Sequence, residues 1–219
     1  MGSKLRLRIS MSLDGFVAGP QQSVDNPLGV GGMRLHDWVF PLKFWREMHG
    51  QSGGEVNASN RVVEESVANV GATIMGRNMF GGQPGPWARE NPWKGWWGED
   101  PPFRSSVFVL THYPRPPLAL GATTFVFVTD GIESALEQAR RAAKGKDVAL
   151  AGGARAAQEY LKARRVDEML ISQVPVLLGA GERLFDGVDD LDGLALVETV
   201  AEPNVTHLRF ARKNGYPVG

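Results

Sequence analysis

The stretch DVALAGGARAAQEYL, residues Asp147 to Leu161, contains a short apolar run, two glycines and an alanine-rich segment of helical character. We interpret it as a strand over 147–151, a turn at Gly152-Gly153 and a helix over 154–163. A glycine pair between a strand and a helix serves either as a tight turn or as backbone that comes close to a phosphate group. The two interpretations stay open on this stretch alone.

The same alternation of strands and helices extends along the chain. Runs rich in apolar, β-branched and aromatic residues predict further strands at 5–11, 72–75, 106–110, 124–128 and 166–178. The end of the chain, 194–200 and 206–212, predicts an antiparallel hairpin. We therefore expect an α/β fold with a mainly parallel central sheet, flanked by helices and completed by this hairpin.

Helices between the strands are expected from apolar residues at helical spacing. One helix is expected at 60–70, with Gly71 as its C-terminal cap. A second is expected to begin at Asp130, which forms a capping box with Glu133. Near residues 34–48 the helical spacing is interrupted by Pro41.

Composition sets limits on the class of protein. The 219 residues contain no internal repeat and predict one domain over 1–219, with a loop rich in Trp, Pro and Gly at about 81–104. Lys plus Arg and Asp plus Glu number 24 each, which gives no electrostatic argument for binding nucleic acid or a membrane surface. No signal peptide or membrane span is apparent. The absence of cysteine excludes disulfides, thiolate metal sites and thiol catalysis, and it fits a cytoplasmic protein.

Small, hydroxylic and cationic residues follow the carboxyl ends of three expected strands, which is where ligands bind in open α/β sheets. These are Gly76-Arg77-Asn78, Thr111-His112 and Gly152-Gly153-Ala154-Arg155. The N-terminus of a helix adds unpaired N–H groups and a partial positive charge. Each segment alone is explained by a turn or a solvated side chain, and neither a GxGxxG nor a GxxxxGK[ST] motif is present. In combination they predict a site for the phosphates of a dinucleotide.

Five motifs in this order resemble the dihydrofolate reductase superfamily. The similarity is greatest to the branch of the riboflavin-biosynthesis reductase domain, the C-terminal domain of a bacterial bifunctional deaminase-reductase, and its stand-alone relatives. The motifs are ISMSLDGFVAG, ATIMGRNMF, FVLTH, LAGGARAAQEYL and DEMLISQVPVLLGAGERLF, and the resemblance covers residues 5–212. The zinc deaminase half of that enzyme needs cysteine ligands, so this chain lacks it.

The resemblance implies a cofactor, NADPH, with NADH as the alternative, and it implies a homodimer. The residues that it implies at the cofactor are Gly76, Arg77, Asn78 and Met79 along the phosphates, Thr111 and His112 near the adenosine 2′-phosphate, Gly152, Gly153, Ala154 and Arg155 around the pyrophosphate, and Val17 and Ala18 beside the nicotinamide. A tyrosine that often follows the glycine pair in dihydrofolate reductases is replaced by Ala157.

The catalytic acid has two candidates. The resemblance implies a carboxylate early in the helix after the first long loop, and the nearest position is Asp37, in RLHDWVF. The second candidate is Asp14, in SLDG. The alternatives are that Asp37 only complements a helix dipole and that Asp14 is only a turn residue. The tryptophan-rich loop is likewise open to two interpretations, a packed lid or dimer surface, or an aromatic wall for a flat substrate.

The favoured function is an NAD(P)H-dependent oxidoreductase that transfers a hydride to a small heterocyclic, pteridine- or pyrimidine-like, or related substrate. An alternative from a different class is an NADP(H)-binding sensor or interaction protein with little turnover. A narrower alternative is the 5-amino-6-(5-phosphoribosylamino)uracil reductase of riboflavin biosynthesis, against which the tryptophan-rich insertion argues.

Overall fold

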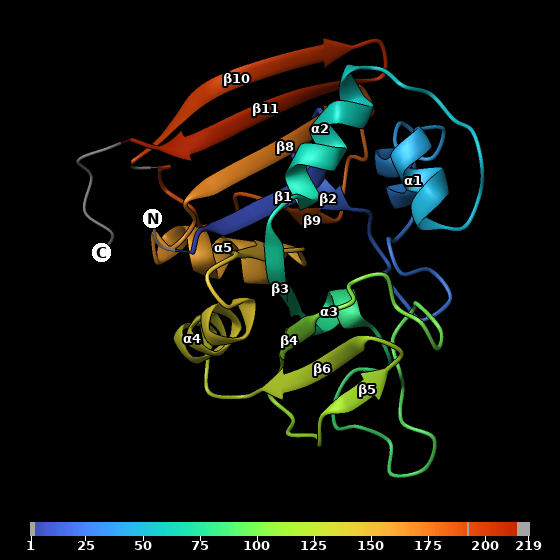
Figure 1. The fold of residues 1–219 in the computed structure, drawn as a ribbon, viewed down its shortest axis with the longest axis vertical. Helices are drawn as coiled ribbons and strands as arrows, with labels where there is room; N and C mark the ends of the chain where they lie inside the picture. The colour runs from blue at the N-terminus through green and yellow to red at the C-terminus, as the bar shows by residue number, and fades with distance from the viewer. Residues whose placement is uncertain (1–2, 192, 214–219) are drawn as a thin grey trace.

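The centre of the computed structural model, which describes residues 3–191 and 193–213, is a nine-stranded sheet in the order β10-β11-β8-β1-β7-β3-β4-β6-β5 (Figure 1). Its strands are β1 (Leu5–Ser12), β3 (Val70–Gly76), β4 (Ser106–Leu110), β5 (Leu118–Leu120), β6 (Thr123–Val128), β7 (Asp147–Leu150), β8 (Glu168–Val174), β10 (Leu194–Glu202) and β11 (Val205–Arg212). The pairs from β8 through β6 are parallel, whereas β5, β11 and β10 pair antiparallel. The expected mainly parallel sheet and the C-terminal hairpin are confirmed.

Helices lie on both faces of the sheet (Figure 1). They are η1 (Gly32–His36, a 3-10 helix), α1 (Lys43–Met48), α2 (Ala58–Val67), α3 (Arg77–Phe80), α4 (Ile132–Ala143) and α5 (Ala154–Lys162). A separate two-stranded sheet pairs β2 (Phe16–Ala18) with β9 (Glu182–Arg183). Among the described residues, no helix is long and apolar enough to cross a membrane.

Side-chain alternation along β1 assigns the two faces of the sheet. Leu5 and Leu7 are buried in the main core, which also contains the apolar residues of α4 and α5. Arg6 and Arg8 alternate with them and point to the other face, where Arg8 Nη1 donates to Ser66 Oγ of α2 at 3.0 Å. The helices α4 and α5 therefore cover one face over the centre of the sheet, and α2 covers the opposite face beside β1.

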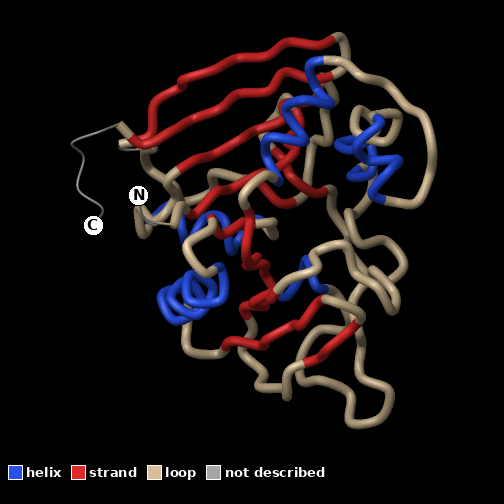
Figure 2. The backbone as a smooth tube through the Cα atoms, viewed as in Figure 1, coloured by secondary structure: helices blue, strands red, loops and turns tan. Residues whose placement is uncertain are grey.

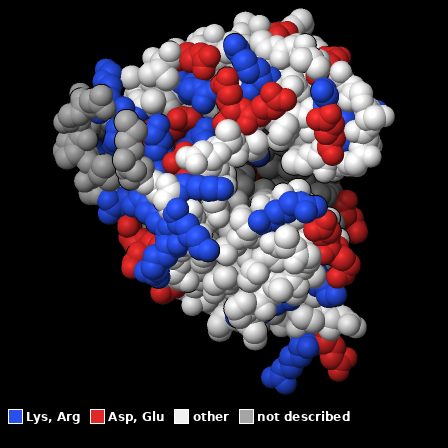
Figure 3. All heavy atoms as spheres, viewed as in Figure 1, with Lys and Arg blue, Asp and Glu red and all other residues white. Residues whose placement is uncertain are grey.

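The α2 face carries a second apolar cluster farther along the sheet. Phe80 of α3 packs with Phe125 and Phe127 of β6 at centroid distances of 5.1 and 5.3 Å. The tryptophan-rich loop continues from α3 to β4 and closes this cluster from outside; it is among the long loops of Figure 2. In Figure 3 the surface is hollowed between the half that carries α1 and α2 and the half that carries α3 and β4 to β6.

Two sequence predictions about helix ends are wrong. The helix expected at 60–70 ends at Val67, and Gly71 lies in β3 and not at a cap. A Cβ on Gly71 would approach the carbonyl oxygen of Ala143 to 2.6 Å, so glycine is needed there for close packing against the end of α4. The chain turns instead at Asn69, which has φ +60°.

The capping box expected at the start of α4 is also absent. The N-cap residue is Gly131, with φ 96° and no side-chain hydrogen bond to the helix. Glu133 does not reach back to Asp130; it accepts a hydrogen bond from Arg165 Nε at 2.8 Å. Pairing with a distant cation has replaced the local reciprocal cap.

Candidate functional site

Three of the predicted site segments meet at one edge of the sheet. The strands β7, β3 and β4 are neighbours and run parallel, so their carboxyl ends lie side by side (Figure 1). The backbone N–H of Gly76 donates to the carbonyl of Gly152 at 2.9 Å. The structure therefore brings the Gly76 and Gly152-Gly153 turns into direct contact, with Thr111-His112 at the end of the next strand.

The glycine pair adopts a backbone conformation that other residues avoid. Gly152 has φ +125° and Gly153 has φ +52° with ψ 139°. Crowding is not the cause, because a Cβ on Gly152 or Gly153 would meet no atom closer than 3.8 Å. Positive φ thus explains why both residues are glycines. Gly152 is buried, with the side chains of Met79 and Ile9 3.8 and 3.9 Å from where its Cβ would lie, and Gly153 is half-buried. Backbone without a Cβ, such as that of Gly153, can lie close to a phosphate.

The N-terminus of α5 follows directly and has no side-chain cap. Gly153 is the N-cap residue, and the first backbone N–H bonded back within the helix is that of Ala157, to Gly153 O at 3.1 Å. The N–H groups of residues 154–156 precede that bond and stay available at the positive end of the helix. Arg155 is exposed and makes no hydrogen bond or ion pair within the described residues. Backbone donors and one cation therefore converge beside the glycine pair.

Arg77 does not extend freely from the end of β3. Its guanidinium carbon lies 3.6 Å from the ring centroid of Trp87, and its Nη2 donates to Gln83 O at 2.9 Å. Burial lowers the pKa of Arg77, and the nearby charge of Arg115 lowers it further. Asn78 is exposed beside it. A cation–π contact thus holds this arginine in the tryptophan-rich loop.

That loop is packed in the manner of a lid. The indole N–H groups of Trp93 and Trp96 donate to the carbonyls of Phe80 and Met79 at 2.8 and 3.0 Å, which caps the end of α3. Trp97 stacks on Phe125 at 5.9 Å. These contacts favour the packed interpretation. Trp87 shares it, because its ring packs against Phe127 at 5.0 Å and its N–H donates to Tyr113 O at 2.9 Å.

Thr111 and His112 differ in exposure. Thr111 is buried; its N–H donates to Val128 O at 3.0 Å, and its Oγ1 accepts from the N–H of Tyr113 at 3.2 Å. His112 is exposed and has no partner among the described residues. The histidine therefore is the group of this pair that is available to a ligand.

Val17 and Ala18 lie in β2, and both are buried. The side chain of Val17 belongs to the main core. A Cβ on Gly181 would come within 2.1 Å of Ala18 O, so the segment that contains β9 lies closely against β2. Because both side chains are buried, only the backbone atoms of Val17 and Ala18 are candidates for contact with a ligand.

Asp14 is engaged in holding two loops together. Its carboxylate accepts from Ser12 Oγ at 2.6 Å, and from the backbone N–H groups of Gly179 and Leu178 at 2.8 and 3.1 Å. The hydroxyl of Ser12 and these two N–H groups lower the pKa of Asp14 to about 2. The carboxylate is therefore an ionised acceptor at neutral pH and not a proton donor.

Asp37 is not in the first turn of a helix, so the local structure expected for it is wrong. It is the C-cap residue of the short helix η1 and is exposed; it makes no hydrogen bond or ion pair among the described residues, and its charge acts on the neighbouring His36. The cause lies in the flanking residues: Gly31, with φ 74°, starts η1, and α1 begins only after Pro41. The chain there forms two short helices in place of one helix with Asp37 near its start.

Arg8 is a site residue that the sequence analysis missed. The register pairs Leu7 with Leu150, so Arg8 stands level with Ala151, immediately before the glycine pair. The residue as a whole is exposed, whereas its guanidinium lies deep enough that burial, and then the charge of Arg6, lower its pKa. It forms no ion pair within the described residues. The alternation of polar and apolar residues along β1 predicts only that Arg8 faces solvent. Its contact with Ser66 depends on the position of α2, which the sequence does not give.

His36 lies close enough to Arg8 to feel its charge. Burial lowers the pKa of His36; a backbone hydrogen bond at Gly32 and the charge of Asp37 oppose this shift, and the charge of Arg8 adds to it. The net direction is downward, which favours the neutral imidazole at pH 7. Its Nδ1 is buried and has no hydrogen-bond partner among the described residues. Arg8 and His36 thus provide a charge and a polar ring on the α2 side of the predicted cofactor site.

A mainly parallel sheet with glycine turns at the carboxyl ends of adjacent strands defines an open α/β fold. The profile of the RibD C-terminal domain family matches residues 3–208. The chain therefore belongs to this family, as the five motifs predicted.

Individual relatives are more distant. An uncharacterized protein, YwjB, from Bacillus subtilis (strain 168) is 32% identical over 69 residues, a match that spans 32% of this chain and 40% of that protein. A putative riboflavin biosynthesis protein from Shewanella sp. PV-4 superposes with a TM-score of 0.59 at 19% identity, covering 98% of this chain and all of the other. A deaminase/5-amino-6-(5-phosphoribosylamino)uracil reductase from Thermotoga maritima gives a TM-score of 0.56 at 13% identity, covering 97% of this chain and 57% of the other.

Proposed function

We propose that the protein is an NADPH-dependent reductase that transfers a hydride to a small, flat, polar substrate. The observation that carries this proposal is the contact between Gly76 and the Gly152-Gly153 pair at the uncapped N-terminus of α5. Bare backbone, unpaired N–H groups and the exposed Arg155 suit a pyrophosphate. Three adjacent strand ends give an extended ligand a continuous surface to follow.

The chain contributes binding and orientation to this reaction. When bound, the nicotinamide supplies the hydride, which is the chemistry that no side chain provides. The turns after β3 and β7 would hold the phosphates, and the backbone of Val17 and Ala18 would lie beside the ring. Asp14 would act as a positioning residue, because it fixes the turn between β1 and β2 to the loop at 178–179.

Arg8 and His36 are the groups that we assign to the substrate. Arg8 lies level with the end of β7 and has no carboxylate partner in the described part of the chain, so it can bind a carbonyl or anionic oxygen. The unpartnered Nδ1 of His36 offers a further hydrogen bond. Together they favour a substrate with several polar atoms on a flat ring.

Asp37 remains the proposed proton donor. Asp14 is held ionised by its three hydrogen bonds, whereas Asp37 has no competing partner among the described residues. Asp37→Asn keeps the shape and removes the acid, so it should leave NADPH affinity nearly intact, slow reduction and change the pH profile. Full turnover in Asp37→Asn would exclude Asp37 as the donor, whatever Asp14→Asn does, because Asp14 holds two loops together and its loss can slow turnover without any proton transfer. Normal turnover in both variants would mean that neither carboxylate supplies the proton, and it would favour chemistry other than reduction of a C=N bond.

The proposal is tested by titrating NADPH while following the fluorescence of the six tryptophans, with calorimetry in parallel. Cofactor bound at the turn after β3 lies next to the tryptophan-rich loop, so we expect quenching together with a heat of binding. The absence of both at millimolar NADPH would exclude the reductase function. Loss of NADPH absorbance with candidate heterocycles then measures turnover.

A second candidate function is an NADP(H)-binding sensor with little turnover. The ionised state of Asp14 favours it, because one of the two predicted acids cannot donate a proton at neutral pH. Tight NADPH binding without oxidation across a panel of pteridine- and pyrimidine-like compounds would support the sensor. Oxidation with any of them would exclude it.

A further inference from the structure

A row of polar side chains crosses the α2 face of the sheet at one level. Ser10 of β1 pairs in register with Ser172 of β8, and Ser172 pairs with His207 of β11. Side chains at paired positions of neighbouring strands point to the same face, which for Ser10 is the face of Arg8 and α2. Ser172 and His207 are buried. Buried polar groups cost stability unless they are hydrogen-bonded, so each of them needs a partner there.

The imidazole of His207 is held from both sides. Its Nε2 lies 2.9 Å from Ser59 Oγ of α2, and its Nδ1 lies 3.0 Å from Ser172 Oγ. Burial, and then the charge of Arg209, lower the pKa of His207 to about 4, so the ring is neutral at pH 7. One ring nitrogen is then a donor and the other an acceptor, and a hydroxyl can serve either role. The two serines therefore satisfy both nitrogens and fix the plane of the ring.

Trp38 rests on this imidazole. The two rings meet edge to face, with centroids 4.9 Å apart and planes at 70°. The indole N–H donates to Leu35 O at 3.0 Å and approaches Ser10 Oγ at 3.3 Å. Trp38 also packs against two apolar clusters, one of Leu35, Val174 and Val205 and the other of Val39, Leu42 and Val63. It therefore joins the segment after η1 to β1, β11 and α2.

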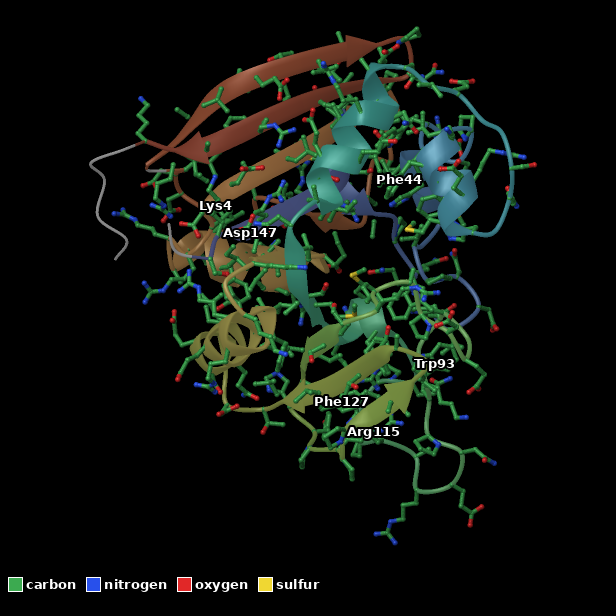
Figure 4. All side chains as sticks on the ribbon, in the orientation of Figure 1. Lys4, Phe44, Trp93, Arg115, Phe127 and Asp147 are labelled. Atoms are coloured by element: carbon green, nitrogen blue, oxygen red, sulfur yellow. The ribbon has the colours of Figure 1, made fainter. Side chains whose placement is uncertain are left out.

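His36 and Asp37 immediately precede Trp38 and have few anchors of their own. Asp37 is exposed and makes no hydrogen bond or ion pair in the described part of the chain, and the buried Nδ1 of His36 has no hydrogen-bond partner there. The hydrogen bond that closes this stretch of backbone runs from Val39 N–H to His36 O, at 3.0 Å. Phe44 of α1, which Figure 4 shows between α1 and α2, packs against the second of the two clusters. The segment is therefore placed mainly by Trp38 and the contacts around it.

Resting on the proposed function, we propose that Trp38, oriented by His207, is the positioning residue for the substrate side of the site. Its ring would hold Asp37, the proposed proton donor, and His36 at a fixed place relative to Arg8. The two serines act one step further away, through the imidazole. The row runs from β1 toward β11, on the side of β1 opposite β7, so it would affect proton delivery and not cofactor binding. Misplacement of a reacting group by about 1 Å can slow a reaction about 100-fold.

The first test is the titration of the His36 ring, followed by NMR in the protein without ligand. The signals of His36 are assigned with His36→Gln. In the wild type, burial keeps the pKa of His36 below its ordinary value. Trp38→Leu and His207→Leu should loosen the segment, raise the pKa of His36 toward its ordinary value and speed hydrogen exchange at the Val39 amide by about 10-fold or more.

Milder variants and a matched control separate positioning from a general loss of stability. His207→Gln retains a donor and an acceptor for the two serines, and Trp38→Phe retains a ring, so both should stay nearer to the wild type than the leucine variants do. Tyr160→Phe removes a buried hydrogen bond, to Ile132 O at 2.7 Å, on the opposite face of the sheet. It should destabilise the protein and leave His36 unchanged.

An unchanged pKa of His36 in both leucine variants, or an equal change in Tyr160→Phe, would overturn the inference. If the leucine variants do not fold, Trp38→Phe against Tyr160→Phe decides in the same way. A small rise in the pKa of His36 in Trp38→Phe alone supports the inference, and no difference between the two variants overturns it.

The second test is turnover, measured as loss of NADPH absorbance across the panel of pteridine- and pyrimidine-like compounds. His207→Leu should lower kcat about 10- to 100-fold and change the KM for NADPH less than about threefold. His207→Gln should recover most of kcat. An unchanged kcat, or an equal effect on kcat and on the KM for NADPH, would overturn the inference and leave the proposed function standing. If the wild type binds no NADPH, the proposed function fails, and the titration of His36 alone decides whether Trp38 positions the segment.

Discussion

Two groups of arginines on opposite halves of the sheet differ in how their charge is balanced. On β11 and β1, Arg209 bonds to Glu198 and Glu168 at 2.8 and 2.9 Å, and Arg6 bonds to the same Glu168 at 3.3 Å. Beyond β3 and β4, Arg77 and Arg115 share Trp87 and have no carboxylate partner in the described part of the chain. The first group is balanced by carboxylates within the protein, whereas the second is held by backbone carbonyls and aromatic rings. An overall balance of 24 cations and 24 anions conceals this local difference.

The largest effect on stability is expected when a carboxylate is removed from the group of arginines on β1 and β11. Glu168→Gln removes the charge that faces Arg209, Arg6 and Lys4, while its side chain is only 14% exposed. We expect a loss of about 2–4 kcal/mol in the free energy of unfolding, because three cations lose the half-buried carboxylate that they share, although Arg209 keeps Glu198 and Arg6 keeps Asp147. Urea denaturation measures it. Glu99→Gln, which affects one exposed pair, should cost at most about 1 kcal/mol. Equal costs for the two variants would show that the balanced group contributes no more than a surface pair.

The glycine pair offers a test of backbone conformation that involves no charge. Gly153→Ala places a Cβ on a residue with φ +52° and should lower the free energy of unfolding by about 1–3 kcal/mol. Gly145→Ala is a useful control, because Gly145 also has positive φ and open space but lies far from the cofactor site, after α4. Reduced NADPH affinity of the folded protein in Gly153→Ala alone would show that this backbone touches the pyrophosphate. Unchanged NADPH affinity would mean that Gly152-Gly153 serves only as a turn between β7 and α5.

Removing a cation from the unbalanced group should affect binding more than folding. Arg77→Ala is expected to weaken NADPH more than NADH by about 1–3 kcal/mol, because a contact between a guanidinium and a phosphate is lost. Its effect on the free energy of unfolding should stay within about 1 kcal/mol, since repulsion from Arg115 is relieved as the stacking is lost. Titrations of both cofactors, with urea denaturation alongside, decide this. Equal losses for the two cofactors would place Arg77 on the shared pyrophosphate or away from the cofactor.

The smallest effect is expected for the pH dependence of stability, through His207, which lies beside the arginines that are balanced by carboxylates. His207 of β11 is buried, with Ser59 Oγ and Ser172 Oγ at 2.9 and 3.0 Å from its ring nitrogens. Burial, with the charge of Arg209, lowers the pKa of His207 to about 4. The unfolded chain therefore binds a proton more readily, so stability is full above the unfolded pKa of about 6.5 and falls as the pH is lowered toward 4. We expect a loss on the order of 1–2 kcal/mol between about pH 7 and about pH 5.

The matched control for that measurement is His207→Asn, which removes the titrating ring. The variant should be less stable at neutral pH and should lose less stability on acidification than the wild type. Parallel stability curves for the two proteins across this pH range would mean that other groups produce the acid sensitivity.

The sequence contained enough information for the sheet, because its strands are apolar runs and parallel neighbours place their carboxyl ends together. It could not show the contacts that distinguish the two arginine groups. Arg77 meets Trp87 only through the path of an irregular loop, and Asp14 finds its partners at 178–179, on another loop far along the chain. The helix expected around Asp37 failed for a local reason, since Gly31 and Pro41 divide that segment into two short helices.

A crystal structure of the protein with NADPH tests the central claim most directly. The account predicts the pyrophosphate against Gly152-Gly153 and the start of α5, with the guanidinium of Arg77 nearer to the 2′-phosphate than to the pyrophosphate. A dinucleotide bound away from the glycine pair would contradict it.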